Sequence, residues 1–172
     1  MPESLTRYLP DPAATAELGA LLAGALLAVA PGSLVLYFNG ELGAGKTALI
    51  RAVLVGLGHR GRVPSPTYTL VEPYELDSYR VVHVDLYRLR DPAELDDLGL
   101  HDELRLRDEA GRGYLLLAEW PARGAGRLPP ADLECQLVSA GPGREVVLVA
   151  KTGVAERLLG KLCSRLSDRD HR

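Results

Sequence analysis

Apolar positions along the chain form long helical segments and short continuous runs, which predict different elements. Residues 13–30 are rich in alanine and leucine, follow a typical helix start at Asp11-Pro12, and stop at Pro31-Gly32. Helices are predicted over residues 13–30, 47–57 and 154–166, and a further one begins over residues 92–97. Within the first of these, residues 18–29 are apolar but form a run shorter than a membrane span, so we expect a buried core helix.

Short runs of apolar and β-branched residues predict strands. There are six such runs, at residues 34–38, 67–72, 80–85, 114–119, 133–138 and 145–150. Turn-forming residues at 73–78 and 140–143 join neighbouring runs, which indicates two β-hairpins. We therefore expect one α/β domain over residues 1–172, in which helices flank a mixed β-sheet and residues 167–172 form a flexible tail.

A glycine-rich segment separates the first predicted strand from the helix that follows it. It reads Gly40-Glu41-Leu42-Gly43-Ala44-Gly45-Lys46-Thr47 and matches G-x-x-x-x-G-K-[ST] at every fixed position. Glycines permit close backbone approach, and the N–H groups of such a loop and helix start bind phosphate. In such loops the lysine reaches the β and γ phosphates and the hydroxyl binds magnesium. The segment predicts a P-loop NTPase-like fold that binds a nucleoside triphosphate with Mg²⁺.

Two carboxylates at strand ends are candidates for a second magnesium-directed acid. Asp85 ends the run 80–85 and Glu119 ends the run 114–119, and the residues alone leave open which one binds metal and which orients water. We expect His83 to lie on the opposite face of its strand from Asp85, as a packed or hydrogen-bonded side chain. Trp120 is either a core anchor or a lid over the site.

Residues 65–67 form a predicted loop that is a candidate for a nucleotide-sensing switch. Ser65-Pro66-Thr67 lies downstream of the glycine-rich loop and its helix, where P-loop folds often carry a segment that senses the γ-phosphate. A loop fixed by proline and ending in a hydroxyl suits that role.

Composition restricts the partners and the compartment. The formal net charge is −3, so a nucleic-acid role would need a local basic patch or a partner protein. The two cysteines form no C-x-x-C pair, and no charged and apolar leader begins the chain. These features favour a cytoplasmic protein without a membrane anchor.

Taken in order, five motifs closely resemble the bacterial TsaE family. They are the glycine-rich loop, Ser65-Pro66-Thr67-Tyr68-Thr69-Leu70-Val71, His83-Val84-Asp85-Leu86-Tyr87-Arg88-Leu89, Leu98-Gly99 and Glu119-Trp120-Pro121. The resemblance extends from about Pro10 to the last helix. Members of this family are small ATPases needed to make threonylcarbamoyladenosine at position 37 of ANN-decoding tRNAs.

The resemblance implies roles for single residues. It implies that ATP sits on the glycine-rich loop, that Thr47 and Glu119 bind magnesium, and that Asp85 is required for hydrolysis. It also implies that Ser65 to Thr67 form the switch-like loop and that Arg144 lies near the adenine. The implied partners are the proteins TsaD and TsaB, which hold the tRNA, so that this chain acts on tRNA indirectly.

Two other P-loop classes are alternatives to this interpretation. A small-molecule kinase needs an arginine-bearing lid, and Arg123 and Arg127 stand in the loop where such a lid would lie. A regulatory GTPase is disfavoured, because the N-K-x-D run is absent and Asp85 does not begin a D-x-x-G pattern.

Overall fold

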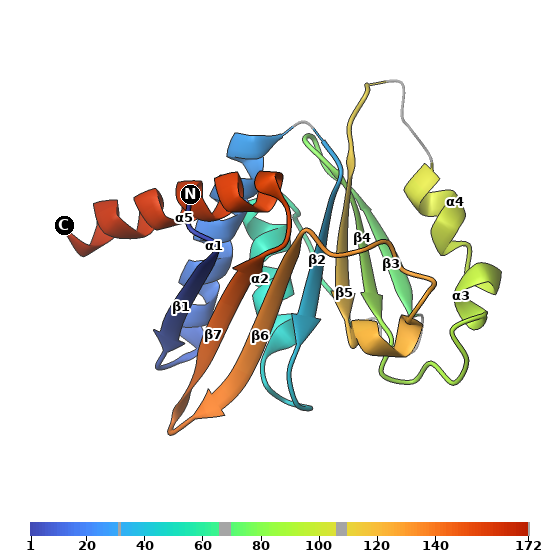
Figure 1. Ribbon diagram of the computed structural model, residues 1–172, viewed down its shortest axis with the longest axis horizontal. Coiled ribbons are helices and arrows are strands. Elements are labelled where there is room, and N and C mark those ends of the chain that lie inside the picture. Colours follow the sequence, from blue (N-terminus) through green and yellow to red (C-terminus); the bar gives the residue numbers. More distant parts are fainter. Residues whose placement is uncertain (31, 66–69, 106–109, 172) are drawn as a thin grey trace.

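The computed structural model describes residues 1–30, 32–65, 70–105 and 110–171. In chain order the elements are β1 (Ser4–Leu9), α1 (Pro12–Val29), β2 (Leu34–Asn39), α2 (Lys46–Gly56), β3 (Val71–Glu75), β4 (Arg80–Asp85), α3 (Glu94–Asp97), α4 (Leu100–Arg105), β5 (Tyr114–Glu119), the 3₁₀ turn η1 (Pro121–Gly124), β6 (Leu133–Ala140), β7 (Gly143–Ala150) and α5 (Gly153–Asp170). Figure 1 shows one twisted sheet crossed by helices.

The described strands form one mixed sheet in the order β1-β7-β6-β2-β5-β4-β3 (Figure 1). Its centre is parallel, because β2 pairs with β5 and β6, and β5 pairs with β4. The hairpins β3–β4 and β6–β7 and the terminal strand β1 add antiparallel pairs toward the edges. The predicted α/β fold with a mixed sheet and two hairpins is confirmed.

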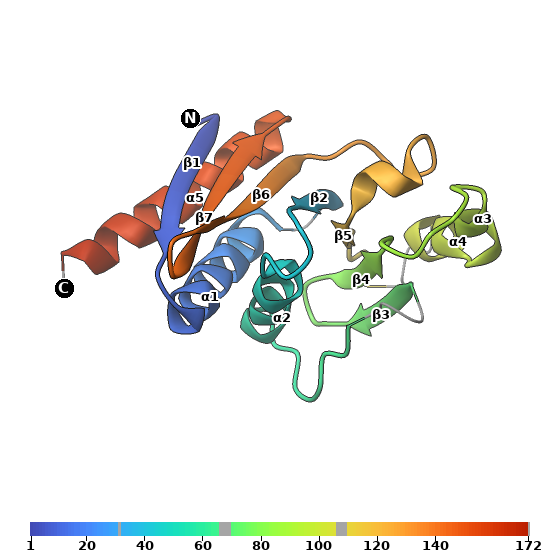
Figure 2. The ribbon, with the colours of Figure 1, turned by 90° about the horizontal axis from the view of Figure 1, so that it is seen from below.

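Alternating side chains of the central strands supply two separate cores. Val81, Leu115 and Leu117 face the larger core, which also contains the buried leucines of α1, α2 and α5. Val82 and Leu116 face the smaller core, to which α3 and α4 contribute. Figure 2 shows α1 and α2 on one side of the sheet and α3 and α4 on the opposite side, near β4 and β5. Burial on both faces explains why these strands read as continuous apolar runs.

Helix α1 is the buried helix that the sequence predicts. Asp11 caps it by accepting a hydrogen bond from the Ala14 N–H at 2.8 Å. Its length and composition would also suit a membrane span, but Leu18, Leu21, Leu22 and Leu26 lie in the larger core. Helix α2 crosses it closely, since a Cβ built on Gly19 would lie 2.3 Å from the Ala52 Cβ. A Cβ on Gly56 would likewise lie 2.5 Å from the Ala23 Cβ, so both glycines are required by the contact.

Several boundaries differ from the sequence prediction, most clearly at β3 and α5. The first strand of the β3–β4 hairpin occupies Val71–Glu75 rather than residues 67–72, of which 67–69 lie outside the described residues. Pro73 was assigned to the turn, but β3 is an edge strand, where a missing N–H is tolerated. Helix α5 continues to Asp170, so most of the predicted tail is helical. Strand β1 and helix α4 were not predicted.

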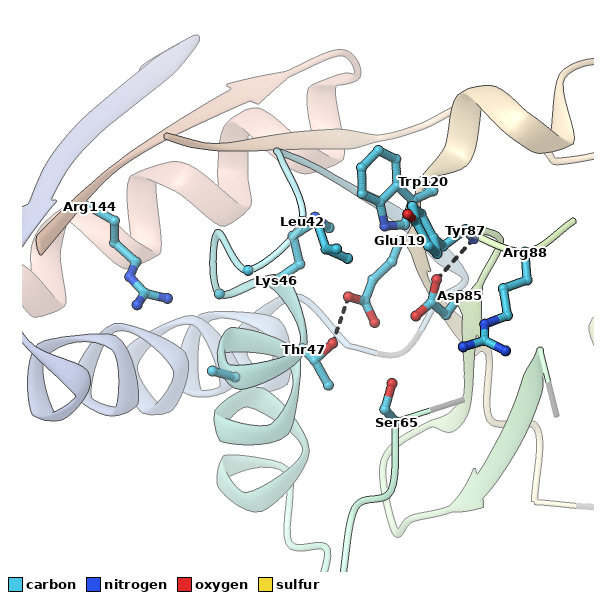
Figure 3. A pocket seen from close by; sticks show the side chains of 13 residues that line it. Leu42, Lys46, Thr47, Ser65, Asp85, Tyr87, Arg88, Glu119, Trp120 and Arg144 are labelled. Atoms are coloured by element: carbon cyan, nitrogen blue, oxygen red, sulfur yellow. Dashed lines mark hydrogen bonds between the residues drawn. The ribbon is translucent and has the colours of Figure 1, made fainter. Parts of the chain in front are cut away.

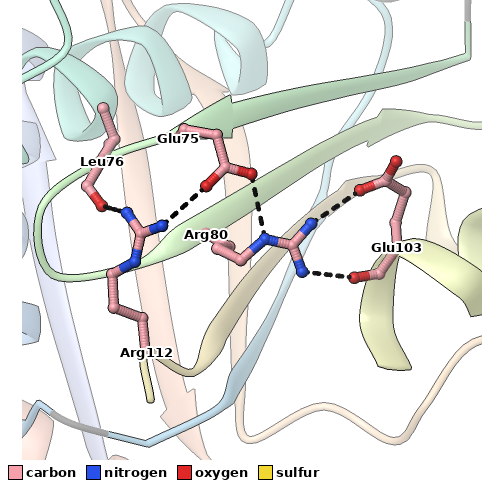
Figure 4. A network of polar contacts seen from close by, with 5 residues as sticks. All are labelled: Glu75, Leu76, Arg80, Glu103 and Arg112. Atoms are coloured by element: carbon pink, nitrogen blue, oxygen red, sulfur yellow. Dashed lines mark hydrogen bonds and ion pairs between the residues drawn. The ribbon is translucent and has the colours of Figure 1, made fainter. Parts of the chain in front are cut away.

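A buried arginine joins three segments at the start of β4, as Figure 4 shows. The Arg80 side chain is 8% exposed and donates to the Glu75 carboxylate at 3.1 Å and to the Glu103 carboxylate at 3.0 Å. It also donates to the Glu103 carbonyl at 3.2 Å. Arg112 binds the other Glu75 oxygen at 3.0 Å and the Leu76 carbonyl. The cluster holds α4 and the chain entering β5 against the β3–β4 hairpin.

We expect Arg80→Met to lower the free energy of unfolding by about 2–4 kcal/mol, because buried charge-assisted hydrogen bonds are lost while both glutamates can regain water. Urea denaturation measures this loss. Arg112→Met is the control, with an expected loss of about 1 kcal/mol, because the Arg112 side chain is 24% exposed and that of Arg80 is 8% exposed. Equal unfolding midpoints for Arg80→Met and the parent would contradict this role.

Candidate functional site

The glycine-rich loop leaves β2 and turns sharply into α2. Its backbone has positive φ angles at Gly43 (78°) and Gly45 (102°), which glycine adopts at little cost. Gly40 passes so close to β6 that a Cβ would lie 2.6 Å from the Leu137 carbonyl oxygen. Gly45 is the N-cap of α2 and has no side chain to cap it. The N–H groups of the first turn of α2 are therefore left for an external anion.

Lys46 folds back over the loop. Its Nζ donates to the Gly40 carbonyl at 2.6 Å and to the Glu41 carbonyl at 2.9 Å, and it lies 4.3 Å from the centre of the Trp120 ring. Burial lowers the pKa of Lys46, while the Glu119, Asp85 and Glu41 carboxylates oppose this shift. The ammonium is held by weak neutral acceptors, which a phosphate would outcompete.

Thr47 and the two strand-end carboxylates converge in front of the loop (Figure 3). The Thr47 hydroxyl donates to Glu119 Oε1 at 2.7 Å. Asp85 is the direct register partner of Glu119 across β4 and β5, so both side chains leave the sheet on the same face. Asp85 Oδ1 also accepts from the Tyr87 N–H at 3.0 Å. Hydroxyl and carboxylate oxygens in this arrangement are ligands suited to a hard cation such as magnesium.

An aromatic wall closes one side of this cleft. Trp120 has a left-handed backbone (φ 56°) directly after Glu119, and its ring lies 5.0 Å from that of Tyr87. The Arg123 guanidinium lies over both rings, at 5.2 Å from Tyr87 and 5.8 Å from Trp120. Trp120 packs against the smaller core and also lines the cleft, and its role as a lid stays a prediction.

The cleft has a volume of about 540 Å³, a size typical of small-molecule sites. It is lined by Leu42, Gly43, Gly45, Lys46, Thr47, Ala48, Ser65, Asp85, Tyr87, Arg88, Glu119, Trp120 and Arg144. In Figure 3 the Ser65 side chain points toward Thr47 and Asp85, while Pro66 and Thr67 lie outside the described residues. Arg144 donates to the Ala44 carbonyl at 2.9 Å, on the far side of the loop.

Most residues that the sequence predicts for the site therefore meet in one cleft. Glu41 is an exception, because it lines a neighbouring cleft together with Trp120 and Arg123, and Ala44 is buried under the loop. Tyr87 and Arg88 were quoted only as part of a motif. Their position two and three residues after a strand-end acid was the signal that could have identified them.

The prediction for His83 was wrong in its geometry. His83 and Asp85 are two residues apart, and side chains of a strand alternate, so both lie on the same face. His83 is fully buried, and its Nε2 lies 2.7 Å from Glu119 Oε2. It is hydrogen-bonded, as expected, but its partner belongs to the site.

The arginines of the alternative kinase lid take different positions. Arg127 forms an ion pair with Asp96 of α3 and is not among the residues that line the cleft. Arg123 stacks outside the aromatic wall. Their described positions do not form a lid over the cleft.

Comparison with known proteins adds an independent line of observation. Residues 9–146 match the family model described as "Threonylcarbamoyl adenosine biosynthesis protein TsaE". The chain is 40% identical to the tRNA threonylcarbamoyladenosine biosynthesis protein TsaE of Haemophilus influenzae, over 91% of this chain and 96% of that one. It is 32% identical to the Bacillus subtilis protein of the same name, over 80% of each chain. The crystal structure of Bacillus subtilis YdiB superposes with a TM-score of 0.71 at 27% identity, over 96% of this chain and 97% of that one.

The contact between Gly45 and Arg144 can be tested by coupled substitutions. A Cβ on Gly45 would lie 1.4 Å from Arg144 Nη1, whereas one on Gly43 would meet nothing within 4 Å. Gly43→Ala and Gly45→Ala should each lower the free energy of unfolding by about 1–2 kcal/mol, because alanine is disfavoured at positive φ. Only Gly45→Ala also displaces the Arg144 hydrogen bond, which should cost about 1 kcal/mol more. Denaturant unfolding should show this excess, and it should vanish in an Arg144→Ala background. An excess that persists there would contradict the contact.

Proposed function

Because the chain belongs to the TsaE family of threonylcarbamoyl adenosine biosynthesis proteins, we propose that it binds ATP with Mg²⁺ and hydrolyses it in support of that tRNA modification. The observation that carries the proposal is the meeting of Lys46, Thr47, Glu119 and Asp85 at the uncapped start of α2. An anion site, a cation site and a second carboxylate beside them that can orient water are the parts that phosphoryl transfer to water requires.

Lys46 and the loop would hold the phosphates. The α2 N-terminus and the N–H groups around Gly43 and Gly45 supply donors, and the helix dipole favours negative charge there. Lys46 would exchange its two carbonyl acceptors for phosphate oxygens, which gives a stronger, charge-assisted interaction. Arg144 borders the same cleft and is our candidate for the base end of the nucleotide.

Thr47 and Glu119 would hold the magnesium ion. Their oxygens are 2.7 Å apart, and neighbouring ligands of an octahedral magnesium ion lie about 3 Å apart, so little movement is needed to admit one. When bound, the ion supplies positive charge against the phosphates. Asp85 stands beside Glu119 and is our candidate for the acid that orients the attacking water.

We further propose TsaD and TsaB as the partners and the cytoplasm as the compartment. The net charge of −3 gives this chain no general basic surface, so an indirect role toward tRNA is the simplest one. A loose phosphoryl transition state needs full positioning and charge stabilisation. We therefore expect slow hydrolysis by the isolated chain and faster hydrolysis in the complex.

The function is tested by phosphate release from ATP, with and without purified TsaD and TsaB from the same organism. We expect several-fold faster release with both partners, and a change in Trp120 fluorescence on ATP addition because its ring lines the cleft. A metabolite phosphorylated in step with ADP formation would instead identify a kinase. A preference for GTP over ATP in competition would identify a GTPase.

Asp85→Asn should separate binding from hydrolysis. The amide oxygen can still accept from the Tyr87 N–H, but it cannot act as a base, so we expect turnover to fall about 100-fold or more with ATP binding retained. Phosphate release and Trp120 fluorescence measure the two effects. Lys46→Ala is the matched variant, in which nucleotide binding itself should be lost. Parental turnover in Asp85→Asn would remove Asp85 from the mechanism.

A further inference from the structure

The Glu119 carboxylate is held at both of its oxygens. Oε1 accepts from the Thr47 hydroxyl and Oε2 contacts His83 Nε2, each at 2.7 Å. Glu119 is 2% exposed and His83 is fully buried, so water gives this pair little support. Burying a carboxylate is costly unless hydrogen-bond donors replace the lost water, and these two contacts supply such donors.

The partner decides which imidazole nitrogen carries the proton. An ionised carboxylate only accepts hydrogen bonds, so His83 Nε2 must donate to Glu119. His83 Nδ1 is buried and has no hydrogen-bond partner within the described part of the chain. Of the two tautomers, the one with its proton on Nε2 leaves only a bare lone pair at Nδ1, which costs less there than an unpaired N–H.

The strand register places the imidazole beneath the carboxylate. His83 is the register partner of Leu117, one pleat before the Asp85–Glu119 pair and on the same face of the sheet. From this position it reaches the inner oxygen of Glu119 and leaves the outer one for Thr47. Its ring is not among the residues that line the cleft. His83 can therefore act on a ligand in the cleft only through Glu119.

We propose that His83 is a positioning residue, whose Nε2–H holds the Glu119 carboxylate in the orientation that pairs Oε1 with Thr47 and so prepares the magnesium site. The inference rests on the proposed function, since it concerns the ligands assigned there. A glutamate side chain has several rotatable bonds, and fixing it before the metal arrives spares that entropy on binding. Outer hydrogen bonds to metal ligands typically change metal affinity by 10–100-fold.

Metal affinity, measured apart from activity, tests the proposal. Mn²⁺ replaces magnesium as the probe, and its binding to the full chain saturated with ADP is followed by electron paramagnetic resonance. In His83→Leu the donor is lost, and we expect Mn²⁺ affinity to fall about 10-fold or more. ADP affinity without metal should stay within about twofold of the parent, because His83 does not line the cleft. In His83→Gln the side-chain amide can donate from a similar position, and most of the affinity should return.

Val81→Ala provides the matched control for lost stability. Val81 is buried on the same strand face as His83, two residues earlier, and it packs in the larger core. The Val81→Ala substitution should lower the unfolding midpoint while leaving Mn²⁺ affinity unchanged. Parental Mn²⁺ affinity in His83→Leu would overturn the inference, as would equal losses in His83→Leu and His83→Gln, or an equal loss in Val81→Ala. Failure of the parent chain itself to bind Mn²⁺ with ADP would instead overturn the proposed function.

Discussion

Parallel pairing of β4, β5 and β2 is the constraint on which the cleft depends. The register that sets Asp85 opposite Glu119 brings two acids from distant parts of the chain to one sheet edge. The same sheet carries β2, whose end delivers the glycine-rich loop to that edge. Because the carboxyl ends of parallel strands meet there, all the chemistry of the site is concentrated beyond one end of the sheet.

That concentration has an electrostatic cost, which the neighbouring groups reduce. Two adjacent carboxylates repel each other, and Glu119 has lost nearly all contact with water. The Thr47 hydroxyl and the His83 imidazole stabilise Glu119 directly, and the Lys46 ammonium favours both acids through space. The cleft is thus preorganised by polar groups on two separate elements, α2 and β4, rather than by any single motif.

The fold and the members of the site could be predicted from the sequence to different degrees. Largely buried elements such as β2 and α1 were predictable, because local signals determine them: a continuous apolar run in β2, and the Asp11 cap before α1. The bounds of β3 were predicted too early in the chain, because Pro73 indicates a turn unless the strand is known to lie at the edge of the sheet. The contact of His83 with Glu119 joins two strands through tertiary register, which no local pattern contains, although simple alternation would have placed His83 on the correct face.

The close crossing of α1 and α2 has a mechanical consequence. Gly19 against Ala52, and Ala23 against Gly56, leave no space for even one added methyl group without separating the two helices. Since α2 begins with Lys46 and Thr47, its axis is braced against α1, which contributes no residue to the lining of the cleft. The start of α2 is therefore held in place by packing in the larger core. A small substitution at the contact between α1 and α2, away from the cleft, would tilt α2 and shift the residues that it carries into the cleft.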